Sequence, residues 1–507
     1  MSLISFPFFV FVLVLVVAYY LIPGKWQWVV ITVFNILFYL SYGMAAVCFF
    51  AATMVLTYTM GILLNRTEDR FGALRKICVD KEQKKKYKAD CVKTKKRIML
   101  VGLFVDFTLW FLFKFTSLFS FSPLGISIYT FIAAGYCIDV YRGKYRAEKN
   151  LLRYASFVSF FPHIVQGPFS RYDALQETLY AENKFNFDRL EQGMIRIVWG
   201  CLKKLVIADR IKVVVDIVLP MDSGYGGIYV FLLFVLLPIQ LYADFSGYMD
   251  IVAGICHMLG ICLQENFKQP FFAKSIDEFW RRWHITLGAW FRDYLFYPVS
   301  MSRAVQKISS RCKDRLSPSF VRMIPSYIAL FFVWSATGLW HGKSWNFLLW
   351  GWINLFCIAS GMQFKPLYER IKGKLHISGE NKWWHLFQMV RTFLIFGFAE
   401  MVSDIPSIYG IWTKCRSLLY ERNWYLLAKP LQLFSGLGTR DLVILGIGVV
   451  MMLILDILKE KNVDVYGLAE RIPVFFRYFG YVTLFYMVVL FGYAGGNAAG
   501  GFMYEQF

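Results

Sequence analysis

The chain has 507 residues, of which 57% are hydrophobic and 19% aromatic, and Lys and Arg exceed Asp and Glu by 55 to 34. A mean hydropathy of +0.48, with apolar runs recurring along the whole length, excludes a row of about three water-soluble domains of ~150 residues each. The net charge of +21 would suit a nucleic-acid-binding protein, but it is concentrated beside an apolar run. We therefore expect membrane lipid, and no nucleic acid, as a partner.

Apolar runs long enough to cross a bilayer follow one another in chain order, since a span needs roughly 20 mostly apolar residues. The first run, 4–22, has no basic n-region and is too long and aromatic for the apolar part of a cleavable signal, so we interpret it as a retained span. The later runs are 28–42, 45–64, 98–115, 228–243, 326–340, 345–362, 387–401, 442–457 and 475–493. With no internal repeat and no low-complexity linker, the sequence predicts an all-α, multi-pass membrane protein with a single domain over 1–507.

A strongly basic segment lies between the third and fourth of these runs. Residues 65–97 hold thirteen Lys or Arg against five acids, which predicts a cytoplasmic loop by the positive-inside tendency. Three runs precede it, so the N-terminus is predicted to lie outside the cytoplasm. The ten cysteines show no CxxC spacing. We expect most of them to be small packing residues, and we predict neither a disulfide framework nor a metal site.

Polar residues gather at four places in or beside the apolar segments. Because burying a polar group in a membrane costs free energy, each of these clusters is a hypothetical functional site. The first cluster ends the segment 122–145. The second, 156–173, contains His163, Gln166 and Arg171. Its prolines, Pro162 and Pro168, end any helix, and broken backbone at membrane depth is tolerated only where it is buried or lines a wet cavity.

The third cluster runs from 242–250, which contains Asp244 and Asp250, to 275–298. Placed on one helix at 100° per residue, residues 275–298 divide into two faces. The apolar face consists of Trp280, Trp283, His284, Leu287, Phe291 and Tyr294, and the charged face of Glu278, Arg281, Arg282, Arg292 and Asp293. A helix rich in Trp and Arg fits a plain anchor at the membrane interface. His284, however, is predicted to point into the protein, where it needs a hydrogen-bond partner or has a functional role.

The fourth cluster is "WSATGLWHGKSWNFLLWGW", residues 334–352, in which His341 stands between Gly338 and Gly342. Two spans joined by a tight turn and one discontinuous helix both fit this pattern. The glycines leave room for a close helix or a ligand. From the residues alone, a histidine satisfied by a neighbouring carbonyl and a functional histidine both remain open.

Six ordered motifs carry a resemblance to a known family. They are "LGISIYTFIAAGYCIDVYRG", "SFFPHIVQGPFSRYD", "YADFSGYMDIVAGICHMLGI", "NFKQPFFAKSIDEFWRRWHITLGAWFRDYLFYP", "TGLWHG" and the closing "GGFMYEQF". In this order they resemble the MBOAT superfamily of membrane-bound O-acyltransferases. They are similar to its bacterial branch, the alginate O-acetylation proteins and the D-alanyl transfer proteins of teichoic acid modification. The motif-bearing core covers about 98–362.

The resemblance implies a ring of roughly 11–13 transmembrane helices around a central tunnel, with re-entrant or interfacial helices. It implies a bacterial plasma (inner) membrane location and a role in polysaccharide modification. The family's essential histidine falls on His341 of "GLWHG", and its second recurring histidine falls on His284. We expect His341 to act as general base, with His284 orienting it, relaying a proton or polarising the acyl carbonyl. Supporting or substrate-binding roles are predicted for a further set: Asp244, Asp250, Trp283, Arg281, Arg282, Trp340 and His163.

The expected reaction needs no bound cofactor and no metal. An acyl-CoA or an acyl carrier protein would supply the thioester from the cytoplasm. The acceptor would be an extracytoplasmic polysaccharide or a partner acyltransferase. Acetyl is preferred, because the region past residue 365 makes the chain long for a D-alanyl transfer protein. Glu505 in the tail motif departs from the family's aromatic pattern. The competing readings are a transporter, which predicts an internal repeat, and a non-catalytic export scaffold, which needs no ordered histidine motifs.

Overall fold

The computed structural model describes residues 2–116, 118, 123–220 and 225–493. Over these residues the fold is helical, and the extended pairing is limited to one isolated bridge between Phe267 and Trp283. The chain divides into two compact units, and helices α9 and α11 run from one into the other. Of the described residues, the first unit contains those within 2–194 and 252–264, and the second contains those within 195–251 and 265–493. The tail motif with Glu505 lies outside the described residues.

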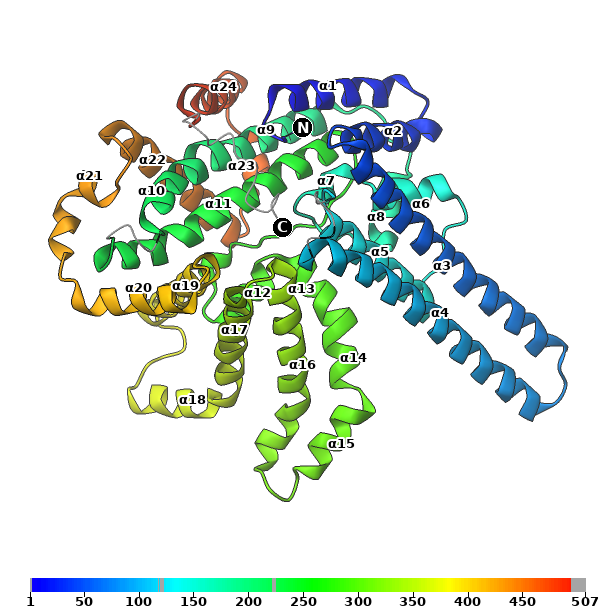
Figure 1. Ribbon diagram of the computed structural model, residues 1–507. Helices are drawn as coiled ribbons and strands as arrows, with labels where there is room; N and C mark the ends of the chain where they lie inside the picture. Colours follow the sequence, from blue (N-terminus) through cyan, green and yellow to red (C-terminus); the bar gives the residue numbers. More distant parts are fainter. Residues whose placement is uncertain (1, 117, 119–122, 221–224, 494–507) are drawn as a thin grey trace. The chain divides into compact units, whose positions relative to one another are not determined.

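The first unit is built from helices of very different length (Figure 1). Its elements are α1 (Phe6–Leu21), η1 (Gly24–Trp26), α2 (Gln27–Leu40), α3 (Met44–Ile77), α4 (Lys81–Phe115), α5 (Ile126–Arg142), α6 (Leu151–Val158), α7 (Phe161–Ile164), α8 (Tyr172–Leu179) and the start of α9 (Phe187–Cys201). Between α6 and α8 the backbone is broken and buried, as the two prolines of 156–173 predicted.

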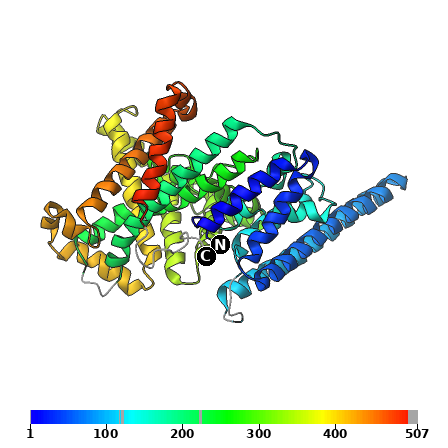
Figure 2. The ribbon, with the colours of Figure 1, turned by 90° about the horizontal axis from the view of Figure 1, so that it is seen from above.

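The basic segment 65–97, predicted as a cytoplasmic loop between two apolar runs, is helical except at residues 78–80, and its cytoplasmic side stays a prediction. Helices α3 and α4 have 34 and 35 residues, so each is about 51 to 53 Å long and exceeds a hydrocarbon core of about 30 Å. They run side by side as the long blue hairpin of Figures 1 and 2. The physical reason is composition, because the many Lys, Arg, Glu and Gln residues of this segment are good helix formers.

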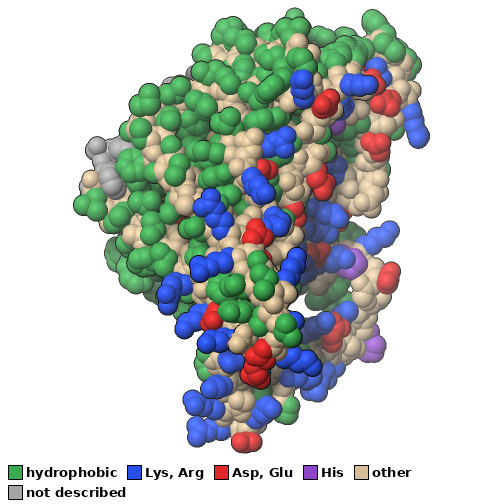
Figure 3. All heavy atoms as spheres, turned by 90° about the vertical axis from the view of Figure 1, so that its right-hand side faces the viewer, with side chains coloured by type: hydrophobic (Ala, Val, Ile, Leu, Met, Phe, Trp, Pro, Cys, Tyr) green, Lys and Arg blue, Asp and Glu red, His purple; other side chains and the backbone are tan. Residues whose placement is uncertain are grey.

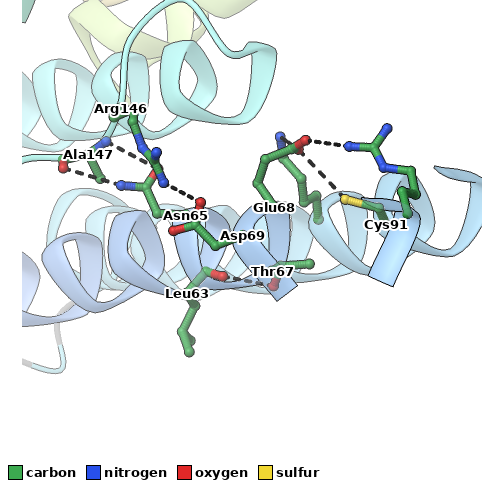
Figure 4. Close-up of polar contacts among 10 residues, drawn as sticks. Leu63, Asn65, Thr67, Glu68, Asp69, Cys91, Arg146 and Ala147 are labelled. Atoms are coloured by element: carbon green, nitrogen blue, oxygen red, sulfur yellow. Dashed lines mark hydrogen bonds and ion pairs between the residues drawn. The ribbon is translucent and has the colours of Figure 1, made fainter. Parts of the chain in front are cut away.

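Polar contacts hold the base of this basic hairpin (Figure 4). Asn65 exchanges hydrogen bonds with the backbone of Ala147, at 3.2 and 3.3 Å, and Arg146 forms an ion pair with Asp69. Farther along, Glu68 of α3 accepts from Lys95 of α4 at 3.0 Å. Figure 3 views the side on which the hairpin ends in Figure 1, and many Lys and Arg side chains lie on that face. The hairpin therefore carries its charge on an ordered helical pair.

The second unit contains the longest run of helices. Its elements are η2 (Leu202–Ala208, a π-helix), α10 (Asp209–Val218), α11 (Ile228–Met258), η3 (Pro270–Phe272), α12 (Ile276–Arg282), α13 (Ile285–Phe291), η4 (Arg292–Phe296, a π-helix), α14 (Tyr297–Ser300), α15 (Arg303–Arg311), α16 (Pro318–His341), α17 (Trp345–Gln363), α18 (Lys365–Lys374), α19 (Lys382–Asp404), α20 (Ile408–Tyr420), η5 (Trp424–Ala428), α21 (Pro430–Leu433), α22 (Thr439–Glu460), α23 (Val465–Glu470) and α24 (Val474–Phe491).

By length and composition, seven described helices are able to cross a membrane: α3, α4, α11, α16, α19, α22 and α24. The bent pair α17 and α18, with 61° between its helices, would make an eighth. The chain is therefore a multi-pass helical membrane protein. The first apolar run forms only the 16-residue α1, about 24 Å long and short of a full hydrocarbon core. The ring of roughly 11–13 spans around a tunnel stays a prediction.

Helices α16 and α17 pack closely and set up the fourth polar cluster (Figure 1). They are separate helices joined by residues 342–344. Helix α16 is a candidate span by itself, whereas α17 qualifies only together with α18, so both alternatives for this segment stay predictions. A Cβ on Gly338 would lie 2.6 Å from the carbonyl oxygen of Phe347, and one on Gly351 would lie 2.5 Å from that of Trp334. The glycines thus admit a neighbouring helix rather than a ligand, and they hold His341 against α17.

Candidate active site

The segment around His284 is not the single helix predicted for 275–298. Helix α12 ends at Arg282, His284 takes a left-handed conformation at φ 46° and ψ 49°, and α13 begins at Ile285. The helix breaks because the extended segment before it forms hydrogen bonds with backbone groups on both sides of His284. Lys268 donates to the Arg282 carbonyl at 2.9 Å, and Ile285 donates to the Asn266 carbonyl at 3.0 Å.

The predicted faces of this segment nevertheless survive the break. His284 is 4% exposed and Trp283 is 2% exposed, so the prediction that His284 points into the protein is confirmed. A non-glycine residue in the left-handed region is uncommon and costs energy, which the surroundings must offset. The bonds made by Asn266 provide that compensation.

Asn266 is fully buried and organises the turn from one side-chain oxygen. Its Oδ1 lies 3.1 Å from the Thr286 backbone nitrogen, 2.8 Å from Thr286 Oγ1 and 3.2 Å from His284 Nδ1. Its Nδ2 donates to the sulfur of Met249 at 3.6 Å. One amide side chain therefore fixes both the start of α13 and the plane of the His284 ring.

His341 is the last residue of α16 and lies in a cage of aromatic rings. The ring centroids of Trp340 and Trp350 are 4.9 and 4.8 Å from its own, and that of Phe347 is 6.4 Å away. The side chain is 9% exposed. Because it stands at a helix C-terminus, the carbonyl dipoles favour positive charge developing on its ring. The position therefore suits a group that takes up a proton.

The structure brings the two predicted histidines together around Trp340. The indole of Trp340 is 6.2 Å from His284 and 4.9 Å from His341, measured between ring centroids. Phe245 covers another edge of His284 at 4.8 Å. Burial lowers the pKa of His284 well below its usual value, and the charge of His341 lowers it further. The neutral, proton-accepting form of His284 is thus favoured at neutral pH.

Behind His341 lies a layer of tryptophans tied to buried polar groups. Trp350 donates from its indole nitrogen to Glu400 Oε1 at 2.9 Å, and Trp280 donates to Asn354 Oδ1 at 2.9 Å. The Trp280 and Trp350 centroids are 5.5 Å apart. A donor-only indole hydrogen-bonded inside an apolar core has a fixed orientation. Glu400 therefore holds the ring that packs on His341.

The predicted residues of α12 make ion pairs of their own. Arg282 reaches both carboxylate oxygens of Glu460, at 2.7 and 3.0 Å, and also Glu278 at 2.9 Å. The Glu460 pair raises the pKa of the Arg282 guanidinium. Arg281 pairs with Asp277 on the exposed side. Arg282 thus ties α12 to the end of α22, while donor recognition by either arginine stays a prediction.

Asp244 and Asp250 of α11 face the π-helix η2. Asp244 lies 2.6 Å from Lys204 Nζ, and Asp250 lies 2.5 Å from Lys203 Nζ and 2.9 Å from Arg196. Buried carboxylates held this way fix the packing of two helices. These contacts support helix packing, the second of the two roles that the sequence left open, and the supporting role in catalysis stays a prediction.

His163 lies in the first unit and is fully buried in α7. Its ring packs edge-on against Phe160 at 5.3 Å and Phe157 at 6.4 Å. Burial lowers its pKa to about 3. Its predicted supporting role remains a prediction.

An apolar cavity of about 900 Å³ lies elsewhere in the second unit, lined from α11, α17, α19 and α20. Its walls include Phe231, Trp352, Phe387 and Phe398, and neither site histidine lines it. Because its helices include candidate spans, such a surface suits lipid chains rather than the reaction.

Sequence reasoning missed three residues that shape this site: Asn266, Trp350 and Glu400. Asn266 lies inside the motif "NFKQPFFAKSIDEFWRRWH", where its position just before the Trp and Arg residues was the available signal. Glu400 is a lone acid in the apolar run "FLIFGFAEMV", and a buried acid in such a run is a functional hypothesis by itself.

Comparison with known proteins identifies the family of the chain. The model of "MBOAT, membrane-bound O-acyltransferase family" matches residues 34–311. The chain belongs to this family. The match includes His284, and His341 lies beyond its end. It also includes the first four of the six motifs on which the resemblance rested, and the motifs "TGLWHG" and "GGFMYEQF" lie beyond its end.

Relatives of this MBOAT chain are named as O-acetyl and D-alanyl transfer proteins. It is 36% identical over 248 residues, 48% of the chain, to "Probable alginate O-acetylase AlgI" of Pseudomonas syringae pv. tomato, covering 44% of that protein. It is 29% identical to "Peptidoglycan O-acetyltransferase" of Helicobacter pylori, over 50% of the chain and 54% of that protein. It is 30% identical to "Teichoic acid D-alanyltransferase" of Bacillus subtilis, over 55% of the chain and 68% of that protein. The chain thus spans about half the length of the first two.

Proposed function

We propose that this MBOAT protein is an O-acyltransferase that takes an acyl group, preferably acetyl, from a cytoplasmic thioester. The acceptor is a hydroxyl of an extracytoplasmic polysaccharide, or a partner acyltransferase that modifies that polymer. The donor is an acyl-CoA or an acyl carrier protein. The protein resides in a bacterial inner membrane with its N-terminus outside. The observation that carries the proposal is the pair of buried histidines, His284 and His341, packed on the same indole.

The reaction needs a base that takes the proton of the acceptor hydroxyl and an acid that protonates the leaving sulfur of the thioester. The acceptor hydroxyl oxygen attacks the thioester carbonyl carbon while its proton passes to His341. The carbon–sulfur bond then breaks, and the leaving thiolate takes the proton back from the His341 imidazolium. The products are an ester and a thiol, and the histidine returns to its starting form. The helix C-terminus beneath His341 stabilises the imidazolium between these steps.

Water exclusion supports the same reaction. Both histidines are at least nine-tenths buried, and tryptophans cover His341 on two sides. A dry site strengthens the interactions that stabilise developing charge and keeps water from hydrolysing the thioester. Arg282 and Glu460 hold α12, the helix that precedes His284, to α22.

The test is His341→Ala in cells whose only copy of the gene carries the change. Loss of a general base predicts a fall of about 10²- to 10⁴-fold in O-acylation. Mild base releases the ester, and mass analysis names and counts the acid. His376→Asn, at an exposed left-handed position, is the matched control for membrane abundance. Normal acylation at normal abundance in His341→Ala would exclude the proposed mechanism.

D-alanyl transfer to teichoic acid is the second candidate. The observation that favours it is the Bacillus subtilis relative, of which the chain covers 68%. The same mass analysis decides, because it finds alanine rather than acetate among the released acids. If neither acid depends on the gene, a transporter or an export scaffold becomes the better reading.

A further inference from the structure

The environment of Asn266 limits what His284 can do in this reaction, because three donors meet at one oxygen. The backbone nitrogen of Thr286 lies 3.1 Å from Asn266 Oδ1. A backbone N–H only donates. The amide atom that faces it must therefore be the oxygen, and the reverse amide orientation would set two donors against each other.

His284 Nδ1 lies 3.2 Å from that same oxygen. An amide oxygen only accepts, so Nδ1 must carry the hydrogen. In a neutral imidazole the other nitrogen, Nε2, then bears the lone pair. The hydroxyl of Thr286, at 2.8 Å from the oxygen, adds a third donor.

We propose that Asn266 is a positioning residue that fixes His284 as the Nδ1–H tautomer, so that Nε2 of the neutral ring can only accept a proton or a hydrogen bond. The use of that tautomer in acyl transfer rests on the proposed function. The consequence is a choice among three roles. A neutral His284 of this tautomer cannot donate to the acyl carbonyl, which leaves it as an acceptor that orients His341 or takes up a proton.

The backbone supports this assignment independently of the ring. His284 is held in the left-handed region by bonds on both sides of the break, from Lys268 to Arg282 and from Ile285 to Asn266. The ring of Phe245 packs edge-on against that of His284, at 4.8 Å and 89°, and supports the orientation that Asn266 fixes. The charge of His341 acts on His284 and lowers its pKa. The amide of Asn266 is uncharged, so it sets the tautomer while favouring the imidazolium less than a carboxylate at the same place would.

The test reads the tautomer directly in the full chain. The six histidines are labelled with ¹⁵N, and the His284 signals are identified by their loss in His284→Gln. We expect a protonated Nδ1 and an unprotonated Nε2 near neutral pH. An Nε2–H tautomer, or an imidazolium at that pH, would overturn the proposal. The NMR measurement requires no catalytic turnover, so it tests the tautomer independently of the proposed function.

Two variants extend the test. Asn266→Asp keeps the oxygen but adds a negative charge beside Nδ1–H, which favours the imidazolium and raises the His284 pKa by at least about one unit in an NMR titration. Asn266→Ala removes the acceptor, and the two tautomers should then both be populated.

The matched control is Asn35→Asp. Asn35 is also fully buried, and its Oδ1 accepts from the backbone nitrogen of Phe161 at 3.0 Å rather than from a histidine ring. It should leave the His284 titration unchanged. An Asn266→Asp titration that matches the wild type would contradict the proposal. If neither Asn266 variant folds, the wild-type spectrum alone decides.

Discussion

Two buried histidine regions behave differently in this protein. His163, in the first unit, sits in an ordinary short helix between two phenylalanine rings. His284, in the second unit, sits at a left-handed break, with an amide on Nδ1 and a tryptophan shared with His341. Both were marked by the same sequence signal, a polar ring in an apolar segment. Burial alone therefore does not distinguish a structural histidine from a functional one. The hydrogen bonds and ring contacts around the histidine identify the functional candidate.

The largest expected effect concerns the coupling of the two site histidines. His284→Gln and His341→Gln should each lower O-acylation by about 10²- to 10⁴-fold, because the groups of a catalytic unit fail together. The O-acylation rate of the double variant should be only slightly below that of the less active single variant. Ester release per protein molecule measures this. Losses that multiply would mean that the two rings act independently.

A smaller effect tests the ring beside His341. Trp350→Phe keeps an aromatic ring but removes the hydrogen bond to Glu400, so the ring gains freedom and the rate should fall about tenfold, or about 1.4 kcal/mol of barrier. Glu400→Gln keeps an acceptor oxygen and should cost less. Trp352→Phe is the matched control, since its 3.0 Å bond to Ser335 lies on the exposed side of the same helix. Equal rates for Trp350→Phe and Trp352→Phe would contradict a positioning role for Trp350.

The smallest effect concerns His163 and appears in stability. Its pKa falls from 6.5 to about 3 on burial, so the unfolded chain binds the proton more readily between these pH values. This contribution to stability is complete above pH 6.5 and is lost as the pH falls towards 3, by about 1.4 kcal/mol per pH unit.

His163→Leu removes this titration, so its melting temperature in detergent should depend less on pH below 6.5 than that of the wild type. Other titrating groups are common to both proteins and cancel in the difference. Parallel curves would show that His163 is accessible to protons in the folded state, and the contrast with His284 would then weaken.

The sequence predicted the parts of the site that depend on periodicity. The two faces of 275–298 are confirmed, with His284 and Trp283 buried and Arg281 exposed. The single helix was wrong, because periodicity reports which side a residue faces and not whether the backbone between two turns is continuous. Asn266, eighteen residues before His284, breaks the helix through contacts that no local pattern contains.

The sequence by itself determined the helical membrane class and the family, because these follow from apolar length and from ordered motifs. The roles that the same motifs gave to His284 and His341 stay predictions. Only the tertiary structure decided that Trp340 joins the histidines, that Glu400 holds Trp350 and that Asn266 carries the bonds at the break. Each of these contacts links residues distant in the chain through the orientation of a ring or an amide. Such orientation depends on packing in three dimensions, which composition and spacing do not encode.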